Sequence, residues 1–125
     1  MTYLGHIGLW SLALGGLSGW AMVLVIDKPE WLRRAGVRHP ARVRQVHLDW
    51  ILMGLILLAV DTAVDDIPEW IGAFIAFGTI VNPLGFVPLL FRADAKDHAL
   101  YRFVITISFT ALSVGLVALA AHASL

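Results

Sequence analysis

The most constraining feature of this sequence is the separation of its charges from four long apolar runs, at about residues 2–26, 46–63, 70–91 and 101–121. A helix rises about 1.5 Å per residue, so about 20 apolar residues cross the roughly 30 Å hydrocarbon core of a bilayer. The mean hydropathy of +0.82 is also high for a soluble domain. The sequence therefore predicts one all-α domain, an integral membrane antiparallel four-helix bundle.

All nine Lys and Arg residues lie in two connecting segments, residues 27–45 and 92–102. With four spans, these segments share one side of the bilayer, and the positive-inside rule places that side in the cytoplasm. We therefore expect a multi-pass protein of the bacterial inner membrane, in contact with the lipid bilayer and with both termini outside the cytoplasm. The basic cluster is typical of a topology signal, so no nucleic-acid partner is expected.

Small residues follow one face of the first run: Gly8, Ser11, Gly15, Ser18 and Gly19. Gly15 and Gly19 form a GxxxG motif, which lets another helix approach closely. The alternative is that they reflect the general tolerance of membrane helices for glycine. A similar face in the fourth run carries Ser108, Ala111, Gly115 and Ala118.

His47 stands at the mouth of the second run, where an ionisable side chain is a candidate functional group. Trp50, Gly54 and Asp61 fall on or near its helical face, and Gly54 leaves room there. The other four histidines are expected at the outer ends of helices or in loops, so a metal cofactor held by His47 would keep a free coordination position. The alternative is that His47 is solvated at the headgroup level. The chain has no cysteine, which excludes thiolate ligands.

Asn82 is a second unusual polar residue, because it lies about nine residues from the end of its span and precedes Pro83. It is expected either to serve a site or to bond another helix or a carbonyl freed by Pro83. Asp49 and Asp61 lie near span ends, and we expect them to position the helix ends and not to take part in chemistry. Asp61 would join the acidic outer rim, and Asp49 would bond interfacial water or a basic loop residue.

Two runs, residues 46–54 and 77–84, together with Gly5 and His6, resemble the small four-helix membrane isomerases, namely the styrene oxide isomerases and hydroxylaminobenzene mutases. The likeness covers about the first three helices. It implies a trimer that binds haem b near subunit interfaces, with His47 as iron ligand beside Trp50 and Gly54. The iron would act as a Lewis acid on a small apolar epoxide or hydroxylamine, with Asn82 holding the oxygen or the developing charge.

Three positions depart from the family pattern. The chain has Met53 where the family carries asparagine, and it has Gly78 and Phe86 where epoxide isomerases carry an acid and a tyrosine. These losses spare the haem ligand and remove polar groups that would orient a substrate. Two alternatives to an isomerase or mutase therefore stay open: a non-catalytic haem or redox subunit, and an accessory membrane subunit without cofactor.

The charge distribution makes a direct prediction about topology. Reporter fusions to either terminus should be active only outside the cytoplasm, because both basic segments are retained inside. A reporter at the C-terminus that is active in the cytoplasm would mean that one of the four runs does not cross the membrane.

Overall fold

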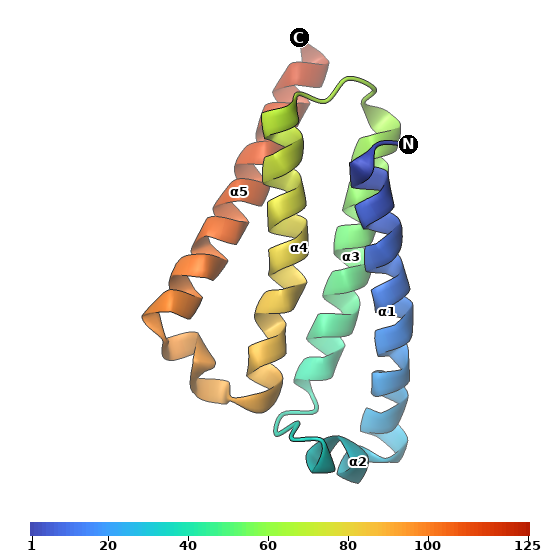
Figure 1. The fold of residues 1–125 in the computed structure, drawn as a ribbon, viewed down its shortest axis with the longest axis vertical. Coiled ribbons are helices and arrows are strands. Elements are labelled where there is room, and N and C mark those ends of the chain that lie inside the picture. The colour runs from blue at the N-terminus through green and yellow to red at the C-terminus, as the bar shows by residue number, and fades with distance from the viewer.

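The computed structural model describes all 125 residues, and it is helical throughout (Figure 1). Its elements are α1 (Tyr3–Asp27), α2 (Pro29–Arg34), α3 (Arg42–Ala63), α4 (Glu69–Phe91), the 3-10 turn η1 (Ala93–Asp97) and α5 (Ala99–Ser124). The helices α1, α3, α4 and α5 are each long and apolar enough to cross a membrane. The predicted all-α bundle with four membrane-spanning helices is therefore confirmed.

The four long helices lie in a row. Helix α1 packs on α3, α3 on α4 and α4 on α5, whereas α1 and α5 share no contact (Figure 1). Both termini and the turn between α3 and α4 lie at one end of the molecule, and α2 and η1 lie at the other. The two basic segments therefore share one end, as the sequence predicts.

Glycine brings α1 and α3 into close contact. A Cβ atom built on Gly8 would lie 3.0 Å from the carbonyl oxygen of Gly54, and one built on Gly54 would lie 2.9 Å from that of Gly8. Further along, Gly15 faces Ile51, where a built Cβ would lie 2.6 Å from Cγ1. The small-residue face of the first run does admit another helix, and that helix is α3 of the same chain.

The second small-residue face joins α5 to α4 in the same way. A Cβ on Gly78 would lie 2.5 Å from the Cβ of Leu112, and one on Gly115 would lie 2.8 Å from a side-chain carbon of Ile75. The Ser108 hydroxyl also donates to the Gly78 carbonyl, at 3.3 Å. Both faces are covered inside the chain, so contacts between copies would have to use other surfaces.

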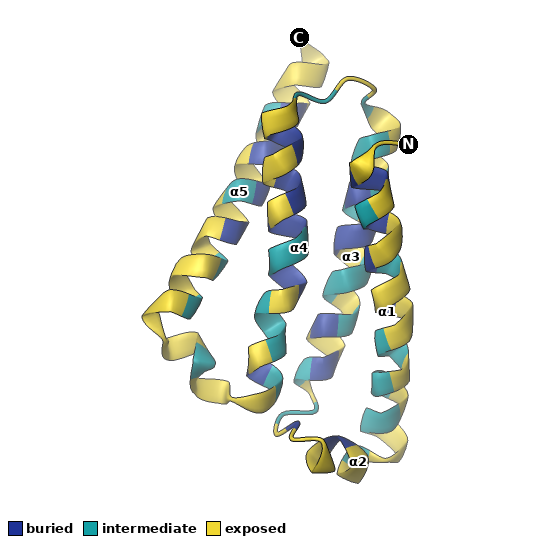
Figure 2. Cartoon of the chain, viewed as in Figure 1, coloured by how far each residue is buried: buried dark blue, intermediate teal, exposed yellow.

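Burial is limited, with 25 of 125 residues buried, as expected for helices whose outer faces meet lipid (Figure 2). The main core lies mostly in the half of the bundle nearer the termini: Leu4, Met53, Leu57, Ile71, Ile75, Ala76, Leu112 and Leu119. Trp10 and Trp20 are about three-quarters exposed, at 73% and 72%. A second, smaller core cluster lies at the basic end and consists of Leu32, Val37 and Val43.

Two features of the helices could not be read from the apolar runs alone. Helix α3 begins at Arg42, because the helix continues past the apolar residues into the basic segment. Helix α4 continues unbroken through Pro83 and Pro88, although proline removes a backbone donor inside a helix. Close to Pro88, the Tyr101 hydroxyl of α5 donates to the Gly85 carbonyl at 2.7 Å and adds a bond from the neighbouring helix.

The contact between α1 and α3 predicts unequal effects of two identical substitutions. Gly54→Ala should lower the melting temperature in detergent, because its methyl group collides with the backbone of Gly8 at a cost of about 1–3 kcal/mol. Gly16→Ala is the matched control, since a Cβ at Gly16 has no neighbour within 4 Å. Equal melting temperatures for the two variants would contradict the close packing of α1 on α3.

Candidate functional site

The imidazole of His47 is tied to α1 through one ring nitrogen. Its Nδ1 lies 2.8 Å from the Gly15 carbonyl oxygen and 3.0 Å from the Ser18 hydroxyl oxygen. Ser18 also donates to the Gly15 carbonyl, at 2.9 Å. Because a carbonyl oxygen only accepts, Nδ1 is the nitrogen that carries the proton in the neutral ring. Nε2 is then the nitrogen with a free lone pair.

The second nitrogen of His47 is open at the surface of the chain. Nε2 makes no hydrogen bond, and no buried side-chain nitrogen or oxygen in the structure lacks a partner. The ring fits against α1 because Gly19 has no side chain, where a built Cβ would lie 3.4 Å from Cε1. The helix contact therefore fixes the tautomer and the direction of the ring, and it leaves one nitrogen available to a ligand.

No other histidine lies beside His47. His6 is on the first turn of α1, and His122 is near the end of α5, where its Nε2 lies 3.0 Å from the Asp66 carbonyl. His39 precedes α3, and His98 precedes α5. No group of three or more His, Asp or Glu side chains could hold a metal ion. His47 belongs to no such group.

Asn82 is buried between α4 and α3, where it bonds Asp49. Its Nδ2 donates to the Asp49 carboxylate at 3.2 Å, with the second oxygen at 3.5 Å. The prediction that Asn82 bonds across to another helix thus describes its contact. The expectation that a basic loop residue bonds Asp49 is wrong. Asp49 faces α4, where its protein partner is Asn82, and it has no ion pair.

His47 and Asn82 lie on different sides of α3. Two residues along a helix are separated by about 200°, so His47 faces α1 while Asp49 faces α4 and Asn82. None of the four cavities in the structure is lined by His47 or Asn82. One chain therefore does not bring the predicted iron ligand and the predicted catalytic amide into one pocket.

The other predicted site residues serve packing in the chain. The space beside Gly54 is occupied by Gly8 and Leu12 of α1, so it offers no open room for a cofactor, and Trp50 is half-buried. Met53 belongs to the main core. A side chain at Gly78 would collide with Leu112, because a Cβ built on Gly78 would lie 2.5 Å from the Cβ of Leu112.

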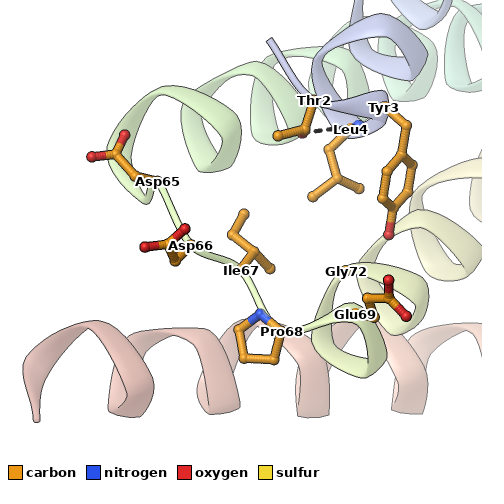
Figure 3. A pocket seen from close by; sticks show the side chains of 9 residues that line it. All are labelled: Thr2, Tyr3, Leu4, Asp65, Asp66, Ile67, Pro68, Glu69 and Gly72. Carbon is orange, nitrogen blue, oxygen red and sulfur yellow. Dashed lines mark hydrogen bonds between the residues drawn. The ribbon is translucent and has the colours of Figure 1, made fainter.

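Asp61 lies at the end of the bundle that carries the two termini, and it holds the N-terminal residues in place. The backbone N–H of Thr2 donates to its carboxylate at 3.1 Å, and the Thr2 hydroxyl also donates to it. Beside it, a cavity of about 320 Å³ is bordered by Tyr3, Leu4 and the turn before α4 (Figure 3). The carboxylates of Asp65 and Asp66 point away from this cavity, so the acidic rim forms no cation site (Figure 3).

Sequence reasoning missed three partners in these contacts, namely Ser18, the Gly15 carbonyl and Asp49 as the partner of Asn82. A signal for the first two existed, because Ser18 and Gly15 belong to the small-residue face that admits α3. Asp49 could have been found from the rule that a polar side chain inside a span needs a polar partner on a neighbouring helix.

The pair of Asp49 and Asn82 predicts a pattern in a double-mutant cycle. Asn82→Leu should lower the free energy of unfolding by roughly 1–3 kcal/mol, because it leaves the Asp49 carboxylate without a donor. The double variant Asp49→Leu with Asn82→Leu should recover much of that loss, since neither partner is then left unpaired. Denaturant unfolding in detergent measures both, and strictly additive losses would contradict the pairing.

The candidate site thus consists of two polar contacts on α3, one toward α1 through His47 and one toward α4 through Asp49. Comparisons with protein-family models, with curated proteins and with solved structures find no match to this chain. The function proposed below is supported by these contacts and by the resemblance of the two short runs described above.

Proposed function

We propose that this protein is a membrane haem b protein in which His47 is an axial ligand of the iron. The observation that carries the proposal is the bond from His47 Nδ1 to the Gly15 carbonyl. Histidines that bind metals almost always donate their other ring N–H to a carbonyl or carboxylate, which orients the free nitrogen. His47 has this arrangement, and its Nε2 makes no hydrogen bond within the chain.

The residues around His47 fit that role. Ser18 and the Gly15 carbonyl hold the ring, and Gly19 makes room for it. When bound, ferric haem would supply a Lewis acid with one open coordination position. Because no cavity of the single chain borders His47 and α1 covers Gly54, the macrocycle needs walls from a second copy. A trimer with cofactors between subunits, as the resemblance implies, meets that need.

Within this proposal, the finer function is an isomerase or mutase acting on a small apolar epoxide or hydroxylamine. Asn82 Nδ2 carries two hydrogens, and only one is needed by Asp49. The other could hold the substrate oxygen. Since Asn82 and His47 lie on opposite sides of α3, the two would act on one substrate only if Asn82 of one copy faced His47 of another.

A second candidate, a haem or redox subunit without isomerase activity, is favoured by one observation. The Asn82 amide is already bonded to Asp49, and that pair is complete within the α3–α4 contact. An accessory subunit without cofactor is the remaining alternative, in which the bond to Gly15 only satisfies an interfacial histidine. The cellular setting proposed with all three is the bacterial inner membrane, with both termini outside the cytoplasm.

The proposal predicts the absorbance of the purified protein. The wild type should show a Soret band, and His47→Ala should lose it while the protein still assembles, because packing rests on the glycine faces. His6→Ala is the matched control, since His6 is exposed on the same helical bundle at the opposite end. A wild type without a Soret band after haem supplementation would favour the accessory subunit.

Added ligand separates the other two candidates. Imidazole or cyanide should shift the Soret band of the ferric wild type if one axial position is open. A six-coordinate, low-spin iron that resists added ligand would keep the haem and favour the redox subunit. A Soret band unchanged by His47→Ala would remove His47 as the ligand.

A further inference from the structure

The largest opening between two helices lies far from His47, between the second half of α4 and the start of α5. It has a volume of about 490 Å³, within the range of about 300–1,000 Å³ that is typical of ligand sites. We call it the α4–α5 cleft. Its lining residues are Val81, Leu84, Gly85, Pro88, Ala95, His98, Leu100, Tyr101, Val104 and Ile105.

The cleft lies where α4 and α5 diverge toward the basic end, although the Ile105 side chain still packs on Gly85 there. Gly78 and Gly115 draw the helices together toward the termini, and α5 leans away from α4 as it approaches η1 (Figure 1). The Tyr101 hydroxyl spans the separation and donates to the Gly85 carbonyl at 2.7 Å. That bond occupies the tyrosine's proton, so the walls are apolar except near His98.

The cleft opens sideways toward the membrane. Three of its lining side chains are also largely exposed: Leu84 at 49%, Leu100 at 74% and Val104 at 38%. In a bilayer, these positions on α4 and α5 meet lipid tails. An apolar chain entering from the membrane would cover them without displacing any protein contact.

One end of the cleft lies at the basic end of the molecule. Arg92 is bonded to Asp94 and holds the pKa of that exposed carboxyl below its ordinary value. Lys96 and Arg102 are exposed and have no ion pair, and they flank His98 in the sequence. This end of the molecule contains nine Lys and Arg residues and only four acidic residues, which are Asp27, Glu30, Asp94 and Asp97. This end therefore attracts anions, and its basic segments are the kind that bind anionic headgroups.

We propose that the α4–α5 cleft is a binding site for an anionic phospholipid. One acyl chain lies in the cleft, and the phosphate lies at its mouth near His98, Lys96 and Arg102. The apolar walls and the sideways opening select the chain, and the unpaired cations select the charge of the headgroup. This site is independent of the haem proposal, because no residue of the cleft contacts His47.

The test is native mass spectrometry of the full-length protein from detergent with equimolar phosphatidylglycerol and phosphatidylcholine of the same acyl chains. We expect the wild type to retain phosphatidylglycerol at least several-fold over phosphatidylcholine. Val104→Trp should reduce that retention several-fold by filling the cleft. Val117→Trp is the matched control, because Val117 is an exposed valine of α5 that lines no cavity. Leu84→Trp fills the cleft from α4 and replaces Val104→Trp if that variant does not fold.

A charge variant tests the headgroup separately. Lys96→Gln with Arg102→Gln should remove the preference for phosphatidylglycerol, whereas Arg33→Gln with Arg34→Gln, in the other basic segment, should leave it unchanged. Equal retention of the two lipids by the wild type would overturn the charge selection. Retention that is unaffected by both cleft-filling variants would overturn the site itself.

Discussion

Polar groups inside this bundle depend on one interaction, the hydrogen bond to another group of the protein. That group lies on a neighbouring helix for His47, Asn82 and Ser108 and on the same helix for Thr79. Hydrocarbon offers no partner, so each buried nitrogen or oxygen must be satisfied by the protein. No buried side-chain nitrogen or oxygen lacks a partner here. The contacts between α1 and α3 and between α4 and α5 make this possible, because glycine lets the helices come close enough for side chains to reach backbone carbonyls. His47 reaches Gly15 in this way, and Ser108 reaches Gly78.

Helix α3 carries both polar contacts of the candidate site because it has neighbours on both sides. Toward α1 it presents a histidine whose ring is fixed and whose second nitrogen is free. Toward α4 it presents a carboxylate that holds a buried amide. The row of helices separates these two contacts, so a reaction that uses both needs a second copy. Under the proposed function, haem binding alone would use the histidine on the side toward α1, with the walls of the site completed by a second copy. The α4–α5 cleft lies beyond both and meets the bilayer.

The fold could be predicted from the sequence because lipid imposes strong and simple rules. Length and hydropathy define four spans, and the placement of the basic residues puts both basic segments at one end. The contact partners of individual residues were harder to predict than the fold. Gly54 was expected to leave room beside His47, but Gly8 and Leu12 fill that room, since the same absence of a side chain suits a cofactor and a helix equally. Asp49 was assigned to the membrane–water interface because the sequence gives its depth in the span but not the neighbouring helix that its side chain faces.

The tautomer of His47 tests the central claim most directly, because a free ligand nitrogen requires the proton on Nδ1. Nitrogen NMR of the cofactor-free protein with 15N-labelled histidine measures it, and the His47→Gln variant identifies the signal among the five histidines. The contact with Gly15 predicts a protonated Nδ1 and an unprotonated Nε2 in the neutral ring, and Ser18→Ala should weaken this preference. A neutral ring with its proton on Nε2 would contradict the bond to Gly15 and leave no oriented nitrogen for iron.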